Sequence, residues 1–292
     1  MEASKKNLCF FAILTYVGFY IALGLCLLIV AFGVPMESMS NYAPLVISWV
    51  SLVVLMIWAK RLLKDSSRKE FLKGLFAEKL RIKWILISII IPSLIFAITV
   101  IVLGTVNHKS IGKLINQDYA SYPLLFILQL LMGPTAEEPG WRGYFFTEVS
   151  AKKGILKGSV ITGLVWGFWH TPLWLMEGLS PLNLIVYAVS FMGAIIGISI
   201  IMGYIFGKHR NLIYCTIIHL LFNFLNALLI IDNNQNSLIF ALVIYAVLYL
   251  LTAGIMILIN RSRSEGRHND GRSASTATHS APCHCERSEA IH

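Results

Sequence analysis

Two adjacent glutamates and an arginine lie in the segment PTAEEPGWRG, residues 134–143, within a stretch of chain that otherwise suits lipid. Glu138 and Arg142 are four residues apart, a spacing that places an ion pair on one helical face. Glu137 then points about 100° away and is the less compensated carboxylate, which suits a general acid or base. Each charge within a membrane costs roughly 2.5–3.5 kcal/mol, so we favour a functional role over a helix-packing ion pair.

Two further groups of polar residues lie in later apolar stretches. His170 belongs to GLVWGFWHTPLW, and His219 and Asn223 belong to CTIIHLLFNFLN. The four-residue spacing of His219 and Asn223 places both on one helical face. Taken singly, each group could be a core histidine or a hydrogen bond between helices, worth about 0.6 kcal/mol in a membrane.

The three groups together predict one polar chamber. Polar side chains within a membrane must find partners, and the nearest ones are each other. A carboxylate and a histidine could activate a water, and a histidine with an amide could stabilise an oxyanion. This set suits hydrolysis of a peptide bond by water, because no serine or cysteine has the surroundings of a nucleophile.

The same side chains leave a metal site open as an alternative. Two histidines and a glutamate, here Glu137, His170 and His219, could hold a catalytic zinc ion with one open position. Their spacing is not the His-Glu-x-x-His of zinc proteases. We favour a mechanism without a tightly bound zinc.

The composition indicates an all-α, polytopic membrane protein. Of its 292 residues, 57% are hydrophobic and 13% are charged, against about 25% charged in soluble domains. Apolar runs of the length that crosses a bilayer recur along the chain. They predict about eight transmembrane helices, at 9–33, 43–60, 84–106, 122–146, 158–176, 182–206, 212–231 and 238–260.

The distribution of basic residues predicts that both the N- and the C-terminus are cytoplasmic. Residues 60–83 carry nine lysines and arginines, whereas Lys109 and Lys113 are the basic residues expected outside. Cytoplasmic loops of membrane proteins are rich in Lys and Arg, and such loops also contact anionic lipid. The basic residues behind the net charge of +9 are therefore expected to lie at the cytoplasmic surface of the membrane. No nucleic-acid partner is expected.

The chain divides by composition into residues 1–260, a membrane-embedded helical domain, and residues 261–292. The last segment is polar and lacks an apolar period, so we expect a disordered tail. Its string CHCERSEAI is similar to translated repetitive DNA, which indicates a spurious extension without function.

The three polar groups resemble the motifs of the CPBP family, the intramembrane CAAX proteases and bacteriocin-processing proteins also called the Abi family. Glu137, Glu138 and Arg142 match Glu-Glu-x-x-x-Arg. His170 matches the second motif, Phe-x-x-x-His, with Trp166 in the Phe place, and His219 with Asn223 matches the third. The ordered triplet covers about residues 120–230.

The resemblance implies an intramembrane endopeptidase in a bacterial plasma membrane, acting on a membrane-associated peptide or protein. By that likeness, Glu137 and His170 activate water, and His219 and Asn223 bind the oxyanion. Glu138 and Arg142 support them. The family is often labelled metalloprotease, although a metal-free mechanism has been argued for eukaryotic relatives, which cleave prenylated CaaX tails.

Two other functions remain as alternatives. A non-catalytic bacteriocin immunity or binding protein could keep the same fold and use the chamber for docking. A proton-coupled transporter would also need membrane carboxylates and histidines, but we find no convincing internal repeat of the kind that transporters often have.

Overall fold

The computed structural model describes residues 2–64, 66–230 and 235–278. Regular structure in these ranges is helical, and the extended pairing recorded there consists of two isolated bridges, Phe76–Asn211 and Ile115–Leu229. The predicted all-α class is confirmed. The chain forms two compact units, Met1–Ala253 and Gly254–His292, and the motif residues belong to the first.

The described residues before the Glu137–Arg142 segment are mainly helical. The bounds of these helices are α1 (Glu2–Ala31), α2 (Met36–Ser48), α3 (Val50–Ile57), α4 (Ala59–Leu62), α5 (Arg68–Gly74), α6 (Ile82–Val106), η1 (Ile111–Lys113) and η2 (Tyr119–Ser121).

The later part of the chain carries the three polar groups. Its elements are α7 (Tyr122–Leu131), α8 (Pro134–Glu138), the π-helix η3 (Pro139–Phe146), α9 (Thr147–Lys153), α10 (Ile155–Trp169), α11 (Thr171–Met176), α12 (Pro181–His209), α13 (Ile213–Leu228) and α14 (Gln235–Thr278).

Four apolar helices are long enough to cross a membrane: Lys5–Ala31, Ile82–Val106, Pro181–His209 and Gln235–Ser262. Large apolar side chains such as Ile21, Ile82 and Leu182 are exposed, as lipid-facing residues would be. The protein is therefore a multi-pass membrane protein. The number of eight spans and their orientation stay predictions, because the remaining apolar helices are shorter.

The interruption that Pro134 and Pro139 predict within the span 122–146 is present. The span divides into α7, α8 and η3, and both breaks lie beside prolines, Pro134 and Pro139. Proline lacks a backbone donor and clashes with the preceding turn, and π-helical turns occur frequently at functional sites. The irregular backbone is buried: every residue from Ala136 to Phe146 is shielded from solvent.

The predicted span 158–176 also contains a break. The helix α10 ends at Trp169, His170 caps it with φ −83° and ψ −2°, and α11 begins at Thr171. Pro172 occupies the first turn of α11, where a missing N–H is tolerated. His170 therefore lies at a junction between two helices.

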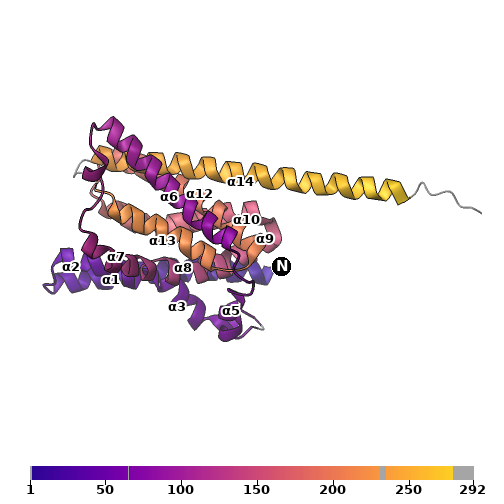
Figure 1. Ribbon diagram of the computed structural model, residues 1–292. Coiled ribbons are helices and arrows are strands. Elements are labelled where there is room, and N and C mark those ends of the chain that lie inside the picture. Colours follow the sequence, from indigo (N-terminus) through magenta and orange to yellow (C-terminus); the bar gives the residue numbers. More distant parts are fainter. Residues whose placement is uncertain (1, 65, 231–234, 279–292) are drawn as a thin grey trace, which may run out of the picture. The chain divides into compact units, whose positions relative to one another are not determined.

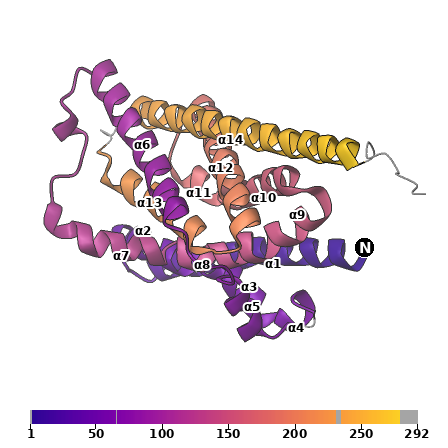
Figure 2. The same ribbon diagram turned by 45° about the vertical axis from the view of Figure 1, so that its right-hand side comes forward.

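Helix packing brings the three polar groups together (Figures 1 and 2). The helix α10 packs along α12, α13 packs against α6, and the short α8 contacts α3, α7 and α13. Ser51 of α3 donates a hydrogen bond of 3.3 Å to the carbonyl of Ala136. This bond ties the backbone beside Glu137 to a neighbouring helix.

The basic segment after α4 contains one short helix. Ser67 caps α5 by accepting from the N–H of Glu70, and Glu70 in turn accepts from the N–H of Ser67 at 2.8 Å. This backbone hydrogen bond lowers the pKa of the exposed Glu70 carboxyl. The reciprocal arrangement is a capping box, which explains why α5 begins where it does.

The predicted boundary at residue 260 lies within the helix α14, and the disorder of the tail stays a prediction. The helix α14 continues to Thr278, and residues 279–292 lie outside the described residues. Once a helix has formed, each added residue gains a hydrogen bond without a new nucleation cost. The apolar part of α14 thus provides the nucleus from which the polar part extends.

Candidate active site

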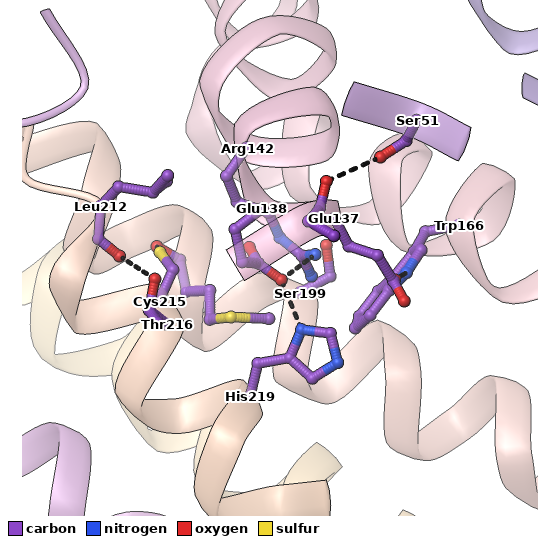
Figure 3. A network of polar contacts seen from close by, with 12 residues as sticks. Ser51, Glu137, Glu138, Arg142, Trp166, Ser199, Leu212, Cys215, Thr216 and His219 are labelled. Atoms are coloured by element: carbon purple, nitrogen blue, oxygen red, sulfur yellow. Dashed lines mark hydrogen bonds and ion pairs between the residues drawn. The ribbon is translucent and has the colours of Figure 1, made fainter. Parts of the chain in front are cut away.

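A buried ionic network joins the first and third polar groups (Figure 3). Arg142 Nη1 donates to Glu138 Oε1 at 2.9 Å, and His219 Nδ1 lies 2.7 Å from the same oxygen. The three side chains are at most 5% exposed. The predicted Glu138–Arg142 pair is present, and Glu138 also orients the ring of His219, which comes from α13.

Glu137 faces a different neighbour from Glu138. The indole Nε1 of Trp166 donates a hydrogen bond of 2.6 Å to Glu137 Oε2. In Figure 3 the carboxylate of Glu137 lies against the indole, whereas Glu138 is turned toward Arg142 and His219. The two adjacent carboxylates thus have separate surroundings.

The hydrogen bond of His170 determines its tautomer. Its Nδ1 lies 2.9 Å from the carbonyl oxygen of Trp166. A carbonyl can only accept, so Nδ1 carries a proton, and Nε2 of the neutral ring has a free lone pair. His170 is therefore prepared to accept a proton or a hydrogen bond through Nε2.

His219 Nε2 and Asn223 Nδ2 both lie close to Gly133. A methyl group at the Cβ position of Gly133 would lie 3.2 Å from His219 Nε2 and 3.0 Å from Asn223 Nδ2. Because Gly133 has no side chain, both nitrogen atoms keep room for a third group. An atom that enters between them could contact both.

One cavity of about 320 Å³ contains the polar side chains of all three groups. Glu137, His170, His219 and Asn223 line it, while Glu138 and Arg142 are buried and are not among its lining residues. The rest of the lining is mainly apolar and aromatic, and comprises Phe19, Pro44, Ile47, Ser48, Gln129, Met132, Trp166, Trp169, Leu173, Phe191, Ile195 and Phe222. The chemical roles of the four polar side chains stay predictions.

Comparison with known proteins bears on the same region. Residues 119–225 match the family described as type II CAAX prenyl endopeptidase Rce1-like. This region of the chain is similar to that family. A protein of Methanococcus maripaludis named CAAX prenyl protease 2 is 27% identical over 200 residues, which cover 65% of this chain and 71% of the relative. The resemblance to the CPBP proteases, predicted from the motifs, is confirmed.

Two residues of the cavity region were missed in the sequence. Trp166 was treated as an aromatic ring in the Phe place of the Rce1-like family motif, although its N–H contacts Glu137. Gly133 was not singled out, although it borders His219 and Asn223. The available signal for Trp166 was the change from Phe to Trp at this motif position. The available signal for Gly133 was a glycine directly before Pro134.

The side chains considered for zinc, Glu137, His170 and His219, each have a hydrogen-bond partner. Across the ranges that the structure describes, no group of three or more His, Cys, Asp and Glu side chains is placed to hold a metal ion. His219 Nδ1 is engaged by Glu138, and His170 Nδ1 by a backbone carbonyl. A histidine that ligates a metal through Nε2 commonly has its Nδ1 held in this way, so the zinc set Glu137, His170 and His219 stays an alternative, and we derive no catalytic step through a metal.

Proposed function

We propose that this protein is an intramembrane endopeptidase that hydrolyses a peptide bond of a membrane-associated peptide or protein. The observation that carries the proposal is the cavity lined by Glu137, His170, His219 and Asn223. A carboxylate, two imidazoles and an amide around one cavity supply a base, a proton carrier and oxyanion donors. The similarity to a protease family supports the same reaction class.

Glu137 and His170 activate the water in the proposed mechanism. Oε2 of Glu137 is held by Trp166, so Oε1 is available to accept a proton from water. Nε2 of His170 accepts a hydrogen bond from the same water and orients it. The water oxygen attacks the scissile carbonyl carbon, and one proton of the water passes to Glu137. That proton later reaches the leaving amine as the C–N bond breaks.

Asn223 and His219 stabilise the oxyanion of the tetrahedral intermediate. Their Nδ2 and Nε2 atoms converge beside Gly133, and fixed donors aimed at developing charge lower the barrier. In the imidazolium form of His219, Nδ1–H keeps its bond to Glu138 while Nε2–H donates to the oxyanion. Arg142 balances the charge of Glu138 and holds it in place.

The finer membrane arrangement is part of the same proposal. We place eight spans in the plasma membrane, with the termini and the basic segment 60–83 in the cytoplasm, following the asymmetry of Lys and Arg. The mainly apolar walls of the cavity suit a substrate that carries an apolar or lipidated portion near its cleavage site.

The test is cleavage by purified protein in liposomes. A quenched fluorescent, farnesylated CaaX peptide is the first probe, because the archaeal relative is named a CAAX prenyl protease; an unprenylated membrane-anchored peptide is the second. We expect Glu137→Ala to lower kcat by about 10²–10⁴-fold, the usual contribution of a general base. The thermal unfolding midpoint of the variant should stay close to that of the wild type.

Two results would overturn the proposal. One is full activity of Glu137→Ala on a peptide that the wild type cleaves. The other is a folded wild-type protein that cleaves neither probe and no peptide of a membrane-anchored library. The second result, with retained peptide binding, would favour the docking alternative.

A further inference from the structure

The side chain and backbone of Trp166 contact members of each of the three polar groups. Its indole N–H donates to Glu137, and its carbonyl accepts from His170. The guanidinium carbon of Arg142 lies 4.0 Å from the centre of the Trp166 ring, and the ring meets His219 edge-on, with 5.1 Å between centroids. The side chain is 1% exposed.

These contacts use two separable properties of tryptophan. The π face that lies near Arg142 is a property of any aromatic ring, since a cation is attracted to the ring quadrupole. The donor to Glu137 is a property of the indole N–H. The family motif usually has phenylalanine at this position, which would supply the ring without the donor.

The hydrogen bond has a direct consequence for Glu137. A carboxylate side chain without a partner can rotate, and either of its oxygen atoms can then face a substrate water. With Oε2 fixed by Trp166 at 2.6 Å, Oε1 is the oxygen that remains for the water. Bonds to ionised acceptors are short and strong, so the indole holds the base in one orientation.

We propose that Trp166 is a positioning residue of this protease, whose indole N–H fixes the carboxylate of Glu137 for attack by water. This inference rests on the proposed function and adds to it the indole N–H of Trp166, which none of the predicted catalytic roles includes. In this chain, the residue at the aromatic position of the second motif donates a hydrogen bond to Glu137 as well as supplying a ring. We expect the binding of substrate to be independent of this hydrogen bond.

The kinetic test compares Trp166→Phe with the wild type in proteoliposomes, using whichever peptide the wild type cleaves. We expect kcat to fall on the order of 10- to 100-fold, the scale of one hydrogen bond to a charged group. KM should change by less than about twofold, because phenylalanine keeps the ring in the cavity wall and the base acts in the chemical step.

A matched variant controls for the loss of an indole from the fold. Trp174 is 6% exposed, and its Nε1 has no hydrogen-bond partner among the described residues. Trp174→Phe removes the same atoms without removing a bond, so kcat and KM should stay close to the wild type. An equal loss of kcat in both variants would overturn the proposal, because it would show a general packing effect.

A spectroscopic test does not depend on activity. The protein has seven tryptophans, and the indole N–H resonance of Trp166 is assigned in ¹⁵N-labelled protein by its absence in Trp166→Phe. In Glu137→Gln the charged acceptor becomes a neutral amide, so this resonance should move upfield while the other indole signals hold their positions.

The outcomes separate this inference from the proposed function. An indole resonance of Trp166 that is unchanged in Glu137→Gln, or a wild-type kcat in Trp166→Phe, overturns the positioning role. A shifted resonance in a protein that cleaves no peptide overturns the proposed function, and the catalytic role of Trp166 with it, while the contact itself stands. If Trp166→Phe does not fold, Trp174→Phe still identifies the indole resonance of Trp174. The positioning role then stands if another indole resonance moves upfield in Glu137→Gln, and it is overturned if none moves.

Discussion

Glu137 and Glu138 are neighbours in the chain with different surroundings. Glu138 accepts from a guanidinium and an imidazole through one oxygen, whereas Glu137 accepts from an indole and lines the cavity. Two carboxylates whose environments differ in this way commonly take different roles in one site. These surroundings support the proposed roles of Glu138 as the supporting carboxylate and Glu137 as the reacting one.

Gly133 provides a prediction at the scale of one atom. In Gly133→Ala, the added methyl group would occupy the space between His219 Nε2 and Asn223 Nδ2. We expect kcat to fall by about 10²-fold or more, because the oxyanion would lose access to its donors. The peptide cleavage assay in proteoliposomes measures the effect.

A second glycine serves as the control for this substitution. A Cβ atom at Gly24 in α1 would meet no atom within 4 Å, so Gly24→Ala should retain activity and slightly stabilise the helix. Wild-type activity of Gly133→Ala would contradict the proposed oxyanion site beside Gly133.

At the scale of elements, close packing of α10 on α12 holds Trp166 in place. Gly203 of α12 faces α10 so closely that a Cβ atom there would overlap Ser159 Oγ, and it would lie 2.9 Å from Phe146 Cε2. Gly203→Ala should therefore destabilise the fold by about 1–3 kcal/mol, the usual cost of overpacking. The thermal unfolding midpoint of the purified protein reports this loss.

A second substitution tests whether this particular overlap is the cause. Ser159→Ala removes the hydroxyl that Gly203→Ala would strike, and that hydroxyl otherwise donates to the carbonyl of Ile155 within its own helix. The double variant should regain part of the lost stability. Equal midpoints for Gly203→Ala and the wild type would show that the two helices are less closely packed than described.

The part of the site that could be predicted from the sequence is the part set by local spacing. The Glu138–Arg142 pair is four residues apart on one segment, so helical periodicity was sufficient to predict its contact. The bond from Trp166 to Glu137 joins positions 29 residues apart, and it depends on how α10 packs against α8 and η3. Likewise, apolar length predicts helices, and Pro134 and Pro139 predict the break beside Glu137, whereas the end of α10 at Trp169 inside the span 158–176 was not predicted.

At the scale of the whole molecule, orientation follows from where basic residues lie along the chain. Ser66 and Ser110 are both exposed and lie on either side of α6. Residues 60–83 around Ser66 are strongly basic, and segments of this kind remain in the cytoplasm. If α6 crosses the membrane, the two serines lie on opposite sides.

This arrangement predicts the labelling of two cysteine variants. In a chain whose five native cysteines are replaced, a membrane-impermeant maleimide applied to intact cells should label Ser110→Cys and leave Ser66→Cys unlabelled. Permeabilised cells should label both, which controls for reactivity. The reverse pattern would place the basic segment outside, and labelling of both variants in intact cells would show that α6 does not cross, because both serines would then face the same solution.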